Sequence, residues 1–200
     1  FPGPTLRTLI KEDNLFLKLR RKGLRCKFAD AYAAESVDEI GARRFKSVTT
    51  VMGLTCPGVF SLREDMLANQ AVFHDITRES LRAKGYTGPV ITPATAAEHL
   101  IQLALTYDFT LFEFFQSDLA GHSNSLDEAA RCLRTLDAFI DPLAAMARDL
   151  NLLFILTIDH GNIENMSVHS HTANPVPLVA FGPGADSLRA GLSSIADVTP

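Results

Sequence analysis

Five side chains that commonly bind metal ions stand in three short clusters in the second half of the chain. They are Asp118 and His122 in QSDLAGHS, Asp159 and His160 in TIDHGN, and His171 in HSHTANPVP. Carboxylate and imidazole groups that converge at one place can bind divalent cations. The first two clusters directly follow apolar runs with the character of β-strands, and residues just past the carboxyl ends of strands in an open α/β sheet face a common crevice. The sequence therefore predicts a metal site.

Taken singly, the first two clusters also have a structural interpretation. Asp118 is either a ligand or a helix cap, and His122 is either a ligand or a surface residue; Gly121 between them lets the backbone turn so that both point into one site. Asp159 and His160 follow the most apolar strand and need polar partners there. They form either part of a metal site or a hydrogen-bonded pair without metal.

The remaining histidines differ in how they are presented. The prolines of ANPVP fix the backbone that presents His171. His169 is either a ligand or a loop residue, and we favour the loop interpretation. His74 and His99 lie on a predicted loop and a predicted helix and are expected to be surface or packing residues.

Alternating helix and strand patterns must position these clusters. The apolar periodicity predicts a helix over residues 92–107 and a long helix from the capping box Ser125-x-x-Glu128 to about Asp149. Strands are predicted at residues 24–32, 108–115, 152–158 and 176–181, and the continuous apolar run at 152–158 is typical of a sheet covered on both faces. Residues 36–88 lack strong strand runs and predict a mostly helical excursion, either a lid or a structural connection.

Composition excludes several classes of protein. The net charge of −4, with 46% hydrophobic and 21% charged residues, is ordinary for a globular domain and gives no basic surface for nucleic acid. No apolar stretch is long enough to span a membrane. The three cysteines form no CxxC pair or disulfide framework, which favours a cytoplasmic setting, and Cys132 is expected to be a small buried residue.

The order of the three clusters resembles the metal-binding half of the alkaline phosphatase superfamily. The motifs D-x-x-x-H, D-H-G-N and H-T-x-N-P-V-P are most similar to those of cofactor-independent phosphoglycerate mutase and phosphopentomutase. The likeness is specific over about residues 109–183 and weaker over 1–35. It implies an α/β fold, with a mostly parallel sheet flanked by helices. The expected core is residues 1–35 and 89–200, and residues 36–88 form a small, mostly helical insertion.

The resemblance also implies a dinuclear metal centre. Asp118, His122 and His171 would bind one divalent cation, Mn²⁺ or Zn²⁺. Asp159 and His160 would bind the second, together with an aspartate and a Ser or Thr nucleophile from the N-terminal part of the domain. We expect that part to precede Phe1, because no Ser or Thr of this chain stands at a matching position.

The expected function is metal-dependent hydrolysis or transfer of phosphate esters, with a small phosphorylated substrate. Residues 36–88 are too short to replace the inserted transferase domain of the mutase, which makes hydrolysis the simpler expectation. The alternatives are a phosphomutase of the phosphoglycerate mutase type, a sulfatase or phosphonate hydrolase, and a non-catalytic metal-binding domain or inactive fragment. The sequence leaves the oligomeric state open.

Overall fold

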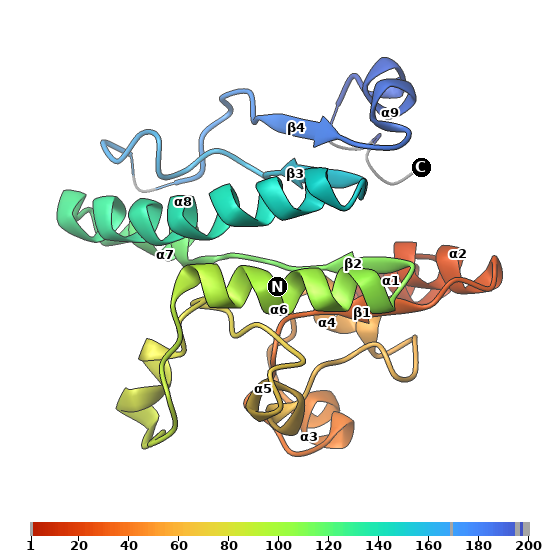
Figure 1. Cartoon of the computed structure of the whole chain (residues 1–200), viewed down its shortest axis with the longest axis horizontal. Coiled ribbons are helices and arrows are strands. Elements are labelled where there is room, and N and C mark those ends of the chain that lie inside the picture. Colours follow the sequence, from red (N-terminus) through yellow and green to blue (C-terminus); the bar gives the residue numbers. More distant parts are fainter. Residues whose placement is uncertain (1, 169, 195–196, 198–200) are drawn as a thin grey trace. The chain divides into compact units, whose positions relative to one another are not determined.

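The computed structural model describes residues 2–168, 170–194 and 197, and divides the chain into two compact units. The first unit comprises residues 1–90 and 98–113, and the second comprises residues 91–97 and 114–200. Figure 1 labels the elements of both units. The three clusters of potential metal ligands all belong to the second unit.

The first unit is built around two short parallel strands, β1 (Cys26–Phe28) and β2 (Phe109–Leu111). A buried cluster around Phe16, Phe28 and Ile40 packs beside them. The helices of this unit are α1 (Pro4–Glu12), α2 (Leu15–Arg21), α3 (Val37–Ala42), α4 (Val48–Gly53), α5 (Arg63–Leu67), the 3₁₀ helix η1 (Glu79–Lys84) and most of α6 (Pro93–Thr106).

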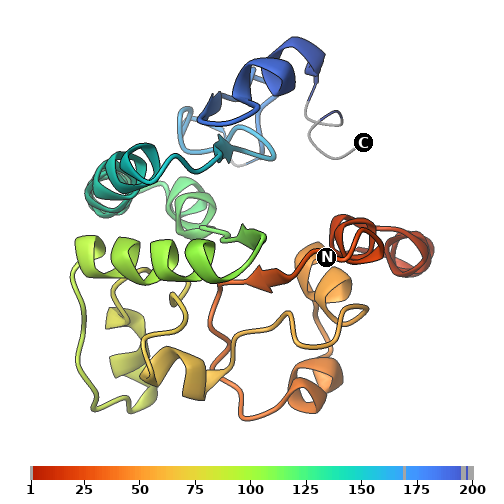
Figure 2. The same cartoon turned by 45° about the vertical axis from the view of Figure 1, so that its right-hand side comes forward.

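Residues 36–88 contain the short helices α3, α4, α5 and η1, and their assignment as a separate insertion stays a prediction. Figure 2 shows this orange-to-yellow segment as short helices joined by loops. Local signals set the helix starts, because Ser36 and Ser47 each accept a hydrogen bond from a backbone N–H of the first turn. The loops also pair with the chain beyond β1, through parallel bridges from Asp30 to Val72 and from Ala31 to Ser61. A lid role for this segment stays a prediction.

The second unit contains α7 (Gln116–Ser123), α8 (Leu126–Asp149), β3 (Phe154–Thr157), β4 (Leu178–Phe181) and α9 (Ala185–Gly191). The predicted long helix is confirmed, and the Ser125 side chain accepts a hydrogen bond from the Glu128 backbone N–H at its start. Strands β3 and β4 pair antiparallel, and the rings of Phe154 and Phe181 stack across them.

The strands are shorter and paired differently than predicted. In the described residues they form two separate pairs, one parallel and one antiparallel, in place of a single mostly parallel sheet. The prediction that the 152–158 strand is covered on both faces is wrong, because burial alternates along β3 and Ile155 is 40% exposed. An antiparallel pair of strands can leave one face open to solvent. In this pair, α8 contacts β3.

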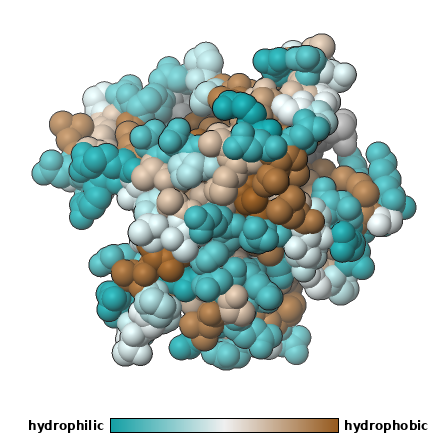
Figure 3. All heavy atoms as spheres, in the orientation of Figure 1, coloured by the Kyte–Doolittle hydropathy of each residue, from teal (hydrophilic) through white to brown (hydrophobic). Residues whose placement is uncertain are grey.

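None of the described helices is both long and apolar enough to cross a bilayer. The face in Figure 3 shows apolar side chains scattered among hydrophilic ones. The described cysteines are all free, and Cys132 is half-buried where we expected a buried residue.

Candidate metal centre

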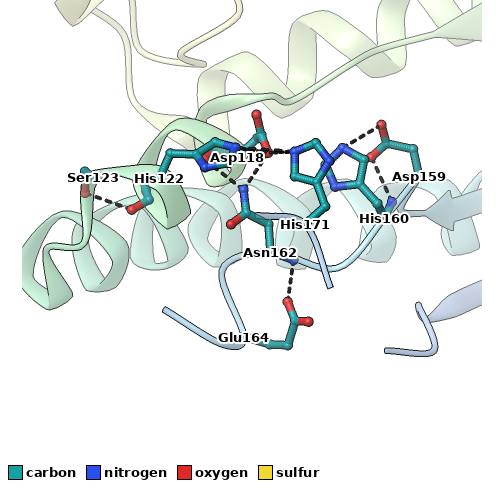
Figure 4. A network of polar contacts seen from close by, with 9 residues as sticks. Asp118, His122, Ser123, Asp159, His160, Asn162, Glu164 and His171 are labelled. Atoms are coloured by element: carbon teal, nitrogen blue, oxygen red, sulfur yellow. Dashed lines mark hydrogen bonds and ion pairs between the residues drawn. The ribbon is translucent and has the colours of Figure 1, made fainter. Parts of the chain in front are cut away.

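Asp118, His122 and His171 converge on one point in the second unit (Figure 4). Asp118 and His122 lie one turn apart on α7, so that both side chains point to the same side of the helix. His171 comes from the loop that precedes β4. Asp118 Oδ1 lies 3.4 Å from His122 Nε2 and 3.2 Å from His171 Nε2, and the two Nε2 atoms are 3.3 Å apart. The i, i+4 spacing of a helix brings the pair together, and no tight turn at Gly121 is needed.

This triangle of atoms has the dimensions of a metal site. Ligand atoms about 2.0–2.2 Å from a tetrahedral ion lie about 3.3–3.6 Å from one another. A neutral imidazole whose Nδ1 carries the proton presents an Nε2 lone pair, and a carboxylate oxygen presents lone pairs of its own. A cation at the centre would therefore be able to contact all three atoms, and the donor set fits a divalent ion.

The pair Asp159 and His160 lies beside this triangle. The His160 ring stacks on the His171 ring, with the centroids 3.6 Å apart and the planes at 13° (Figure 4). His160 Nε2 lies 3.3 Å from Asp159 Oδ2, while His160 Nδ1 is buried without a hydrogen-bond partner among the described residues. The structure brings His160 to the triangle, but the Asp159 side chain is 80% exposed. The assignment of all five residues as metal ligands stays a prediction, and His169 lies outside the described residues.

Asn162 is part of this site and was missed by the sequence analysis. Its buried side-chain amide donates to the Asp118 backbone oxygen at 3.1 Å and to Asp118 Oδ1 at 2.5 Å. A Cβ atom at Gly121 would lie 2.4 Å from Asn162 Oδ1, so a larger residue there would displace the amide from its place beside Asp118. The available signal was its place directly after Asp159-His160-Gly161, since a polar residue in that apolar setting needs a partner.

Glu164 joins the loops that carry the second and third clusters. Its Oε2 accepts the Asn162 backbone N–H at 2.6 Å, and its Oε1 accepts the Asn174 side-chain N–H at 3.0 Å and the Thr172 hydroxyl. The Thr172 backbone N–H also donates to the Gly161 carbonyl at 2.9 Å. The hydrogen bonds from Thr172 and Asn174 lower the pKa of Glu164 to about 2. The carboxylate thus holds the chain on both sides of the site in a fixed arrangement.

Replacing Glu164 with glutamine should weaken metal binding. The carboxylate accepts from donors on both oxygens, and a glutamine NH₂ group would face one set of donors with another donor. We expect Glu164→Gln to lower Mn²⁺ affinity about 10–100-fold, the usual cost of losing a partner behind the ligands. Isothermal titration calorimetry measures the change, with the exposed Asp141→Asn on α8 as the control. Equal affinity of the two variants would contradict the role assigned to Glu164.

We expect the same carboxylate to make the second unit less stable in acid, which circular dichroism measured against pH would show. The folded pKa of Glu164 is depressed to about 2 from 4.5, so its stabilising hydrogen bonds are complete above pH 4.5. They are lost as the pH falls from 4.5 towards 2, where the folded state also takes up the proton.

Two further carboxylates missed by the sequence analysis lie in the first unit, just past the ends of β1 and β2. Asp30 Oδ2 accepts the Glu113 backbone N–H at 2.8 Å, and the Thr49 hydroxyl donates to the Glu113 carboxylate. Burial raises the pKa of Asp30 well above its usual range. Burial also raises the pKa of Tyr32 to about 12. Acidic residues directly after KFA and TLF were the available signal, by the rule that identified Asp118.

The curated relatives compared with this chain share one name. The chain is similar to 2,3-bisphosphoglycerate-independent phosphoglycerate mutases. It is 30% identical to that of Helicobacter acinonychis over 104 residues, which cover 48% of this chain and 21% of the relative. It is 32% identical to that of Mycoplasmoides gallisepticum over 101 residues, 48% of this chain and 20% of the relative. For Helicobacter pylori strain J99 the identity is 28% over 126 residues, 60% of this chain and 24% of the relative.

The match thus spans about a fifth to a quarter of the length of these curated relatives. No solved structure matches the chain significantly. A family model described as the Metalloenzyme superfamily matches residues 68–199, about two thirds of the chain, and this range includes all three clusters. The chain belongs to the Metalloenzyme superfamily.

Proposed function

We propose that this chain carries the metal-binding part of an enzyme that hydrolyses or transfers phosphate esters. The triangle of Asp118 Oδ1, His122 Nε2 and His171 Nε2 carries this proposal, because it brings a carboxylate and two imidazoles within the distances expected between ligands of one ion. Family membership and the phosphoglycerate mutase relatives support it. The substrate would be a small phosphorylated molecule.

In this proposal some residues of the site bind the cations, and others position those ligands. Asp118, His122 and His171 would bind one divalent cation, and Asp159 with His160 would bind a second; Mn²⁺ and Zn²⁺ both suit mixed carboxylate and imidazole ligands. When bound, paired cations neutralise phosphoryl oxygens and lower the pKa of an attacking hydroxyl. The contacts of Asn162 fix the orientation of Asp118 before any cation arrives.

A phosphomutase is the second candidate, and the similarity to phosphoglycerate mutases favours it. The two activities differ in where the phosphoryl group goes. A hydrolase releases inorganic phosphate into water, whereas a mutase returns the group to another hydroxyl of the substrate. Phosphorus NMR of a phosphoglycerate reaction separates a free phosphate signal from a second phosphoglycerate isomer.

The proposed function can be tested by measuring metal and phosphate-analogue binding, without following a reaction. We expect Mn²⁺ to bind the chain and vanadate, a mimic of phosphate, to change the electron paramagnetic resonance spectrum of the bound Mn²⁺. The change should disappear in His122→Ala and persist in His74→Ala, which alters a histidine of the first unit. Mn²⁺ binding without any response to vanadate would favour a non-catalytic metal-binding domain.

A further inference from the structure

A cavity of about 250 Å³ in the first unit is lined mainly by polar side chains. Its lining comes from β1, from α5 and the residues that follow it, and from α6. Its polar lining residues include Lys27, Asp65, Asn69, Gln70, His99 and Gln102. None of them belongs to the metal clusters or to the contacts that hold those clusters.

Lys27 brings a buried positive charge to the cavity. The residue is 6% exposed, and burial lowers its pKa while the nearby Asp65 raises it. Its ammonium group donates to the Phe60 carbonyl at 2.9 Å and forms an ion pair with Asp65 Oδ2 at 3.8 Å. Asp65 Oδ2 itself accepts the Leu62 backbone N–H at 2.7 Å. An ammonium group has three N–H donors, so Lys27 retains donors that a ligand can use.

Arg78 adds a second buried cation directly behind the cavity wall. It is 1% exposed, and its Nη2 donates to the Met66 carbonyl at 2.9 Å and to Asn69 Oδ1 at 3.0 Å. Its Nε has no hydrogen-bond partner, and its guanidinium forms no ion pair with a carboxylate of the described residues. A buried charge is costly unless it is paired, so this arrangement favours an anion nearby.

Asn69 and His99 place further polar groups at the cavity surface. Asn69 Oδ1 is taken by Arg78, which leaves the Asn69 amide N–H groups as donors at the wall. His99 Nδ1 is buried without a hydrogen-bond partner among the described residues. Burial and the charge of Arg78 lower the pKa of His99, so its ring is neutral near pH 7 and can donate one hydrogen bond.

The cavity lining holds one cation and one carboxylate among the described residues, Lys27 and Asp65, which form an ion pair. Arg78 adds a second cation behind the wall, where the Asp75 carboxylate accepts its backbone N–H but forms no ion pair with its guanidinium. The other polar groups at the wall include three side-chain amides. We propose that this cavity binds a small oxyanion, either phosphate or a short carboxylate, against Lys27 and the amide donors of Asn69, Gln70 and Gln102.

The test uses the metal-free chain in EDTA, so that its result does not depend on the proposed function. Inorganic phosphate, malonate and chloride are titrated at matched ionic strength, and ¹H–¹⁵N spectra follow the side-chain amides of Asn69, Gln70 and Gln102. We expect saturable shifts with phosphate or malonate and none with chloride. The stronger of the two identifies the ligand as a phosphate or a carboxylate. Equal, non-saturating shifts with all three salts would overturn the proposal.

Two variants locate the site. Lys27→Met keeps the length of the side chain and removes the charge, and we expect it to raise the Kd at least tenfold. Lys22→Met, at an exposed lysine after α2, should leave the Kd unchanged. If Lys27→Met does not fold, Gln102→Leu on the exposed surface of α6 decides, with an expected loss of at least threefold. An unchanged Kd in the folded cavity variants would place the anion elsewhere and refute the assignment.

Discussion

Alanine at His171 should remove the tighter of two Mn²⁺-binding events measured by calorimetry. His171 Nε2 is one corner of the triangle with Asp118 and His122, and its loss leaves only two ligand atoms at that position. Loss of a partner behind a ligand costs about 10–100-fold in affinity, and loss of the ligand itself should exceed about 100-fold. The remaining contacts of Thr172 and Asn174 with Glu164 should keep the loop in place.

His160→Ala is the matched comparison, because its ring stacks directly on His171. We expect this variant to reduce only the weaker event, since Asp159 and His160 offer two protein ligands for a cation where the triangle offers three. His74→Ala serves as a control for removing a histidine of the first unit. Loss of the tighter event in His160→Ala with retention in His171→Ala would reverse the division of the ligands.

Signals that are local in the sequence predicted the helical framework well. The Ser125 cap and the apolar spacing after it predict α8, and the structure has both the cap and the helix. The same applies to α6, whose bounds agree with the prediction within one residue. Such features depend on residues a few positions apart, which a single sequence displays directly.

Pairings between distant segments could not be predicted in the same way. The apolar run at 152–158 indicates a strand but does not say whether its neighbour is parallel or which of its faces is covered. The order of the metal clusters predicted which residues would be neighbours. The contacts that hold them, from Asn162 to Asp118 and from Glu164 to Asn174, join loops whose conformation follows from the folded chain.

Alanine at Gly182 should strongly destabilise the second unit. Gly182 follows β4 with a φ of +92°, and an added Cβ would lie 2.1 Å from the Leu152 carbonyl oxygen. That oxygen belongs to the backbone just before β3, whose first residue pairs with Phe181, so it cannot move without disturbing the ladder. We expect a loss of about 3–5 kcal/mol in the free energy of unfolding, which is at the large end for single substitutions. Urea denaturation followed by circular dichroism measures it, because the chain has no Trp.

Gly184→Ala separates backbone strain from the collision. Gly184 has a similar φ of +84°, but nothing lies within 4 Å of an added Cβ. Its alanine variant should therefore show only the left-handed backbone cost, about 1–2 kcal/mol. Because β3 leads into Asp159 and His160, and β4 follows the His171 loop, a disturbed β3–β4 pairing should also weaken Mn²⁺ binding. Gly182→Ala should show both losses and Gly184→Ala only the smaller loss of stability. Equal stability of the two variants would mean that the contact with Leu152 is relieved by local movement. A less stable Gly182→Ala with unchanged Mn²⁺ binding would mean that the pairing does not hold the metal ligands in place.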